Sequence, residues 1–192
     1  MKKFFSAFLA LLMCLCTALP AMASAPSFRW NATEFCSTFN PILYNFINES
    51  TTWKSPDANT RIGTFANSPV IRISSENGKV TSISAISVLS AFDDEDTAYA
   101  KNEGLWFSMV TCCSSAAIFN DYDILTDMDV QEQMYEIIGT LYNNAFEKPD
   151  YSKAATVYTQ TITFCDIDIT CHTFWWDWTS PTVIIFTMVP SN

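Results

Sequence analysis

His172 is the only histidine in the chain, so any catalysis by a Ser–His or Cys–His pair must use it. A cysteine nucleophile needs a base close in space and a third group that orients this base. The residues that could complete such a set are Cys112, Cys113, Asp168 and Asp177. The adjacent Cys171 is a poor partner, because successive side chains of a strand point to opposite faces. No known nucleophile signature surrounds these residues, so a small extracellular hydrolase or thiol enzyme that uses His172 is the alternative hypothesis.

Four acids lie close together between two predicted helices and are candidate ligands for Ca²⁺. They are Asp121, Asp123, Asp127 and Asp129. A loop that begins at Asp121 has the length of an EF-hand loop, but Leu125 and Thr126 occupy positions that require an oxygen ligand and a glycine. Two interpretations remain. The acids form an irregular carboxylate cage for Ca²⁺, or they form a polar turn in which Asp127 or Asp129 caps the next helix.

The aromatic run from His172 to Trp178 is the candidate binding site, with Trp175, Trp176 and Trp178 as its tryptophans. In a strand, the alternation of side chains places Phe174, Trp176 and Trp178 on the face of His172. Trp175 and Asp177 then lie on the opposite face. If one face is exposed, it is an apolar platform for a protein, peptide or glycan ligand. The alternative is that helices cover these rings and the aromatic residues serve the core.

Five cysteines lie beyond the N-terminal segment, and an odd number leaves at least one thiol free or paired between molecules. They are Cys36, Cys112, Cys113, Cys165 and Cys171. Cys165 and Cys171 flank a short segment and form a possible disulfide, because export permits disulfides. Cys112 and Cys113 are neighbours in a predicted helix, where they cannot easily bond to each other. A single histidine and the lack of a CxxC spacing argue against structural zinc.

The first 23 residues have the pattern of a cleavable secretion signal of the bacterial type. Lys2 and Lys3 precede an apolar stretch that runs from residue 4 to residue 16, and Ala21-Met22-Ala23 is a small-x-small cleavage site. The stretch is shorter than the roughly 20 apolar residues of a membrane span, although an uncleaved anchor is the alternative. We therefore expect a signal peptide at 1–23 and a single secreted globular domain at 24–192.

The charge of the expected mature domain is strongly negative. The first 23 residues hold two of the ten basic residues and none of the twenty acids, which leaves a net charge of −12. Eleven of the acids lie between Asp93 and Glu136, opposed only by Lys101. This balance argues against nucleic acid, which needs basic patches to neutralise phosphates. No later segment is long and apolar enough to span a membrane.

Hydrophobic periodicity predicts three helices and five strands. The helices cover residues 31–48, 95–119 and 130–146. The strands cover residues 61–73, 80–89, 156–164, 170–178 and 182–189. The element order α-β-β-α-α-β-β-β is typical of an α+β fold, with helices packed on a largely antiparallel sheet of about five strands. The last strand is apolar on both faces, so we expect it inside the sheet rather than at its edge.

Local signals give more specific predictions. Asn31 with Glu34 three residues later resembles a capping box at the start of the first helix. Pro41 should kink or divide that helix. Asn77-Gly78 is the strongest short hairpin signal in the chain. Gly104 destabilises the second helix, so it either lets another backbone approach or marks a break.

No residue pattern in the chain identifies a family or a reaction. The leading hypothesis is therefore a secreted, non-enzymatic binding or interaction module with an acidic helical half.

Overall fold

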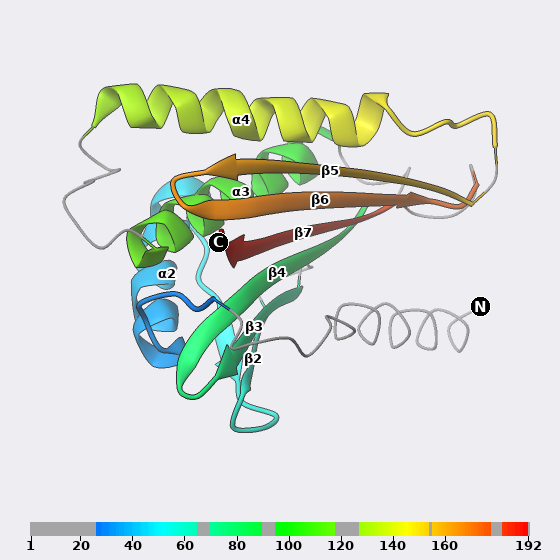
Figure 1. Ribbon diagram of the computed structural model, residues 1–192. Coiled ribbons are helices and arrows are strands. Elements are labelled where there is room, and N and C mark those ends of the chain that lie inside the picture. The colour runs from blue at the N-terminus through cyan, green and yellow to red at the C-terminus, as the bar shows by residue number, and fades with distance from the viewer. Residues whose placement is uncertain are drawn as a thin grey trace.

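The computed structural model describes residues 26–64, 70–89, 95–117, 127–153, 155–177 and 182–191. These residues form one antiparallel sheet with helices packed against it (Figure 1). The helices are α2 (Ala32–Ile47), α3 (Glu95–Ala117) and α4 (Met128–Glu147). The strands are β1 (Thr52–Lys54), β2 (Thr60–Thr64), β3 (Val70–Glu76), β4 (Lys79–Leu89), β5 (Thr156–Phe164), β6 (Ile167–Trp175) and β7 (Thr182–Pro190).

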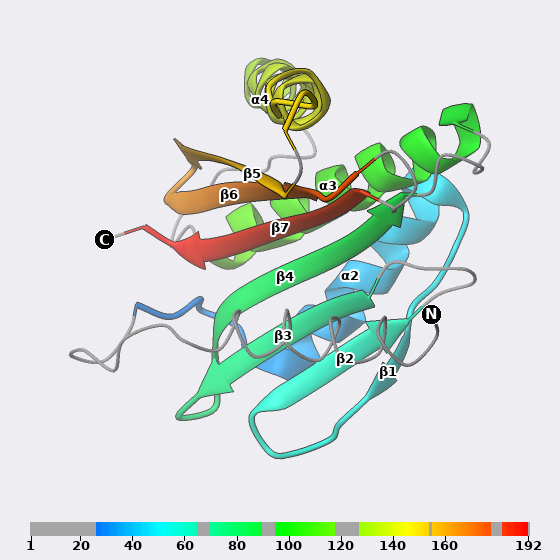
Figure 2. The same cartoon turned by 90° about the vertical axis from the view of Figure 1, so that its right-hand side faces the viewer.

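The sheet has seven strands in the order β1-β2-β3-β4-β7-β6-β5. Figure 2 shows α2 and α3 behind the sheet, while α4 lies at the end that carries β5 and β6. The predicted α+β class and the antiparallel sheet are confirmed. The apolar strand β7 lies between β4 and β6 rather than at an edge, as its composition predicts.

The expected number of about five strands is wrong, since the structure has seven. The predicted strand over 61–73 is two strands, β2 and β3, which pair with each other. The additional strand β1 has three residues and lies in a segment that is rich in turn-forming residues. Such a short strand exists because its backbone pairs with β2, and this pairing leaves no periodic signal in the sequence.

The capping box at the start of α2 is confirmed. The Asn31 Oδ1 atom accepts hydrogen bonds from the backbone N–H groups of Thr33 and Glu34, each at 2.9 Å. In return, the Glu34 Oε2 atom accepts from the Asn31 N–H at 2.8 Å. Two orphan amides of the first turn and the cap itself are thereby satisfied.

Pro41 does not divide α2, which continues from Ala32 to Ile47. Proline removes one backbone hydrogen bond from a helix. The buried side chains Phe35, Phe39 and Leu43 lie on both sides of this position, and we attribute the continuity to their packing in the core. Of the two predicted outcomes, division of the helix is therefore wrong, and a kink at Pro41 stays a prediction.

The predicted hairpin at Asn77-Gly78 joins β3 to β4. Both turn residues have positive φ, 51° for Asn77 and 78° for Gly78. A two-residue turn of this kind matches the right-handed twist of the strands, and asparagine and glycine tolerate it best.

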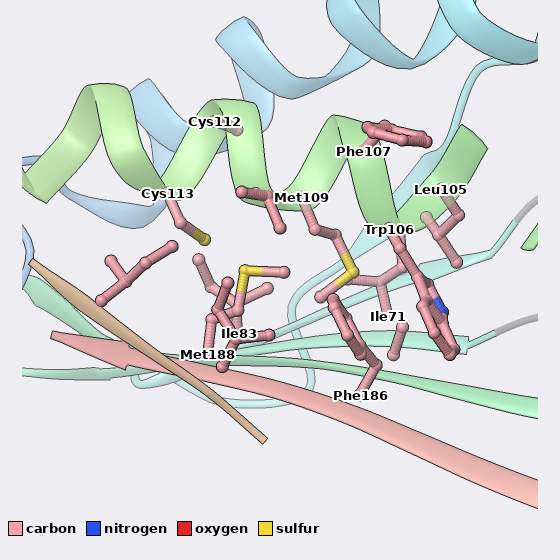
Figure 3. Packing of buried hydrophobic residues seen from close by; sticks show 14 of the residues in the cluster. Ile71, Ile83, Leu105, Trp106, Phe107, Met109, Cys112, Cys113, Phe186 and Met188 are labelled. Atoms are coloured by element: carbon pink, nitrogen blue, oxygen red, sulfur yellow. The ribbon is translucent and has the colours of Figure 1, made fainter. Parts of the chain in front are cut away.

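The core lies between the helices and one face of the sheet (Figure 3). Trp106 of α3 stacks on Phe186 of β7, with ring centroids 4.2 Å apart and ring planes at 5°. The same indole meets the Tyr142 ring of α4 edge to face at 5.5 Å. The buried Trp106 of α3 thus contacts both α4 and the central strand β7.

Gly104 of α3 marks a close approach and not a break. The helix continues through it, and a Cβ atom at this position would overlap the Ile47 side chain of α2. The predicted break is therefore wrong, and the close approach at Gly104 is made by a side chain of α2 rather than by the predicted backbone. The first two helices of the layer are therefore packed closely at this point.

Candidate functional site

The sheet has two faces with different surroundings. We call the face that packs on α2, α3 and α4 the covered face, and the opposite face the outer face. On the covered face, Ser87 Oγ donates to Asn102 Oδ1 of α3, and Gln160 Oε1 accepts from Asn144 Nδ2 of α4 at 2.9 Å. The described part of the chain places no helix over the outer face (Figure 2).

The two neighbouring tryptophans of the aromatic run differ in burial, and the alternation of an extended chain directs them to different faces. Trp175 is only 6% exposed and meets the Tyr151 ring edge to face at 5.3 Å. Trp176 is 58% exposed. The Trp176 carbonyl accepts a hydrogen bond from Ala155 N–H at 3.1 Å, so strand-like pairing with the β5 side continues past the end of β6. Trp175 is therefore a core residue, and Trp176 is available at the surface. Trp178, the third predicted binding residue, lies outside the described residues.

We call Val157, Phe174 and Trp176 the apolar patch. Val157 of β5 stands opposite Phe174 of β6 in the strand register and is 57% exposed. Phe174 is partly buried, and on its other side it stands opposite Val183 of β7. The patch thus crosses β5 and β6 at one end of the outer face, next to β7.

A buried apolar cluster lies beside this patch on the outer face. Its members are Ile86, Val183 and Ile185, each 3–4% exposed, and the partly buried Val88 and Phe174 pack against them. This cluster is separate from the main core on the other side of the sheet. It explains why residues 182–189 are apolar on both faces, and that pattern was the available signal for an apolar region on the outer face. Val157 was not singled out from the sequence because its position depends on the pairing of β5 with β6.

Hydroxyl groups occupy the adjoining rows of the outer face, and they bond to side chains on the next strand. Thr161 and Thr170 share a hydrogen bond of 2.9 Å, and Ser84 and Thr187 share one of 3.0 Å. Thr163 donates to the Asp168 carboxylate at 2.6 Å. Cross-strand pairs of this type stabilise a sheet. They also engage part of the hydrogen-bonding capacity of these hydroxyls.

His172 lies between the apolar patch and these hydroxyl pairs. Its Nδ1 atom is 2.9 Å from Thr159 Oγ1, and its ring centroid is 6.3 Å from that of Phe174. Partial burial lowers the pKa of the imidazole, because desolvation disfavours the charged ring.

The geometry does not assemble the predicted Cys–His set. Cys112 and Cys113 are buried in the main core, under the covered face, while His172 is on the outer face. Asp168 is four residues from His172 on the same strand, about 13 Å away. Among the described residues, no hydrogen bond joins His172 to a thiol or a carboxylate.

Cys171 points into the covered face, where burial raises the pKa of its thiol to about 12. A thiol with so high a pKa is protonated at neutral pH and is a poor nucleophile. Cys171 therefore packs as a small apolar side chain.

The possible Cys165–Cys171 disulfide is not formed, and both thiols are free. Cys165 lies in the two-residue turn between β5 and β6, while Cys171 is well inside β6. From Ile167 to Cys171 the strand already extends by about 13 Å. A disulfide requires Cα atoms within about 7 Å. The pairing fails because the short segment between the cysteines runs along one strand and does not fold back.

Of the four predicted Ca²⁺ ligands, the structure describes Asp127 and Asp129. Asp121 and Asp123 lie outside the described residues. Asp127 is the N-cap of α4, and its Oδ1 atom accepts from the N–H groups of Asp129 and Val130 at 3.0 and 3.2 Å. The capping interpretation is therefore confirmed for Asp127. In the part of the chain that the structure describes, no three metal-binding side chains are grouped together.

Comparison with known proteins adds no assignment: no family model matches the chain, and no curated protein or solved structure matches it. None of the described helices has the length and apolar character needed to cross a membrane.

Proposed function

We propose that this chain is a non-enzymatic binding module that uses the apolar patch of the outer face to hold a polypeptide partner. The observation that carries the proposal is the exposure of Trp176 and Val157, 58% and 57%, with Val157 opposite Phe174 on a face without a described helix and Trp176 two residues after Phe174. Large apolar side chains that remain exposed together mark interaction surfaces. Tryptophan is also enriched among the residues that dominate binding energy.

A polypeptide fits this surface better than a glycan does. The patch and the buried cluster beside it combine aromatic with β-branched side chains, which complement the apolar side chains of a protein or peptide. A sugar needs free hydrogen-bonding groups around the aromatic ring. Here the nearby hydroxyls of Thr159, Thr161 and Thr170 bond to neighbouring side chains, which leaves each of them only part of its hydrogen-bonding capacity.

The net charge and the predicted export signal indicate which class of partner the domain binds. The expected mature domain carries a net charge of −12, which steers cationic partners toward it and repels anionic ones. We also propose that residues 1–23 direct export and that the partner is therefore extracytoplasmic. The supporting features are the basic start, the apolar stretch and the cleavage site of this segment.

A peptide array tests the proposal directly. The purified protein, its Trp176→Ala variant and a Tyr44→Ala control are each applied to an array of random peptides. Tyr44 of α2 is also an exposed aromatic residue, 54% accessible, but it lies on a helix of the other layer. We expect the peptides that bind the native protein to lose at least about tenfold in affinity with Trp176→Ala, since an interface hot spot contributes 2 kcal/mol or more.

The control and a parallel glycan array decide the outcome. The Tyr44→Ala variant should retain the native peptide profile, and both variants should unfold near the native temperature because both side chains are exposed. Peptides that bind native protein and Trp176→Ala equally well would refute the apolar patch as the binding site. If the native protein binds to the glycan array and not to the peptide array, the partner is a carbohydrate and not a polypeptide.

A further inference from the structure

Two cysteines from different helices, Cys36 of α2 and Cys112 of α3, lie at the same place in the contact between these helices. Both thiols are free in this structure. The Cys112 Sγ atom is 4.0 Å from the carbonyl oxygen of Phe35, the residue before Cys36. In a trans peptide this oxygen lies about 2.8 Å from the next Cα atom, so Cys112 Sγ is within about 7 Å of Cys36 Cα. Over this distance, rotamer changes at the two cysteines can join their sulfur atoms.

The packing of α3 on α2 supports this placement. A Cβ atom at Gly104 of α3 would overlap the Ile47 side chain of α2. Cys36 precedes Ile47 by eleven residues, which is about three helical turns, so both side chains leave the same side of α2. Cys112 follows Gly104 by about two turns of α3. The contact that brings α3 close to α2 at Gly104 therefore extends along both helices to the two cysteines.

The ionisation and exposure of the two thiols agree with this geometry. Burial raises the pKa of Cys112 well above its ordinary value, and the neighbouring Cys36 raises it further. Cys36 is partly exposed, and burial raises the pKa of its thiol to about 11. A dissolved reagent therefore reaches Cys36 first, while the fully buried Cys112 reacts only with a group already held at this contact.

The other described cysteines have different surroundings. Cys113 points from α3 toward the sheet (Figure 3). Cys171 is buried inside β6, and Cys165 lies in the turn between β5 and β6. No other thiol contributes to the raised pKa of Cys165 or Cys171. Within the described part of the chain, thiols from two different elements thus meet between α2 and α3.

We propose that Cys36 and Cys112 are oxidised to a disulfide that joins α2 to α3. The Cys36 thiolate attacks one sulfur atom of a small-molecule disulfide, such as oxidised glutathione, and expels one glutathione thiolate. The Cys112 thiolate then attacks Cys36 Sγ in this mixed disulfide and expels the second glutathione. Two protein thiols are thereby oxidised, and one glutathione disulfide is reduced to two thiols. The proposal rests on the proposed export, because protein disulfides persist in oxidising compartments.

Oxidative refolding of the purified chain tests this pairing, and its outcome does not depend on whether residues 1–23 direct export. The reduced, unfolded chain is refolded with reduced and oxidised glutathione, alkylated, and digested with trypsin. We expect the refolded chain to lack two hydrogen atoms by mass, and one cross-linked species to join fragments 30–54 and 102–153. Reduction should lower the melting temperature by about 5–15 °C, because a cross-link over a long loop restricts the unfolded chain.

Alanine variants identify the paired residues. Cys36→Ala and Cys112→Ala should each lose the cross-link and the effect of reduction on the melting temperature. Cys113→Ala removes the other thiol of fragment 102–153 and should keep both. Cys165→Ala is the matched control for Cys36→Ala, since both thiols are half-buried, and it should also keep both. Because Cys36 is partly exposed, Cys36→Ala should fold even where a substitution in the core does not.

Three results would each overturn the proposal. In the first, Cys36 and Cys112 are both alkylated after refolding of the native chain. In the second, the cross-link survives Cys36→Ala or Cys112→Ala. In the third, Cys113→Ala removes it, so that Cys113 and not Cys112 is the partner of Cys36.

Discussion

The two faces of the sheet come from the same strands and the same alternation of side chains, yet they are packed in different ways. The covered face buries large side chains against helices, as in the stack of Trp106 on Phe186. The outer face carries hydroxyls that bond across strands, a thin β-branched layer, and the exposed apolar patch. Most of the buried large side chains therefore lie on the covered face, and the outer face adds the smaller buried cluster of Ile86, Val183 and Ile185.

The neighbouring residues Trp175 and Trp176 differ in burial in the same way as the two faces do. Trp175 meets Tyr151 and is buried, while Trp176, which alternation places on the opposite side, is exposed. Their residue type and local sequence are nearly the same. The difference in role therefore comes from what lies over each face.

The largest expected effect is the loss of a buried ring from the covered face. Trp106→Ala removes the contacts with Phe186 and Tyr142 and leaves a cavity, so we expect unfolding to become easier by about 3–5 kcal/mol. Val157→Ala on the outer face should change stability by no more than about 0.5 kcal/mol. Urea unfolding measures both. Similar losses at the two positions would contradict the division between the faces.

Alanine substitutions at two glycines should have intermediate effects on stability, and the two effects should have opposite signs. Gly104→Ala places a methyl group against Ile47, and we expect a net loss of about 1–3 kcal/mol because crowding exceeds the gain in helix propensity. Gly139→Ala in α4 has open space around the new methyl group, so it should stabilise by roughly 1 kcal/mol. Thermal unfolding of the two variants under the same conditions checks the prediction. Stabilisation by both would show that α2 and α3 are not closely packed at Gly104.

The smallest expected effect is the pH dependence of the outer face at His172. Burial lowers the imidazole pKa in the folded protein below its unfolded value of about 6.5. The unfolded chain then binds more protons, so this contribution to stability is complete above pH of about 6.5 and is lost as pH falls through the folded pKa. The melting temperature of His172→Gln should therefore fall less between pH 7.5 and 5 than that of the native chain. If the melting temperatures of the two proteins fall equally over this pH range, protonation of His172 does not destabilise the folded protein.

Local features were predicted well because their physical causes lie within a few residues. The Asn31–Glu34 capping box and the Asn77-Gly78 turn depend on side-chain hydrogen bonds and backbone angles at those positions. The helices and the later strands follow from periodic burial. Predictions that depended on distant partners were less successful. The strand β1 and the absence of a Cys165–Cys171 bond both depend on packing or pairing with other segments.

For the candidate site, the sequence placed Phe174 and Trp176 on one side of a strand and Trp175 on the other, because alternation is a property of any extended backbone. It did not determine which side the helices cover. That outcome required the strand order, which brings Val157 beside Phe174 and sets Trp175 against Tyr151. The sequence by itself therefore determined the elements, their caps and the alternation of faces. Only the tertiary structure decided which face became core and which tryptophan remained exposed, since burial depends on contacts between segments far apart in the chain.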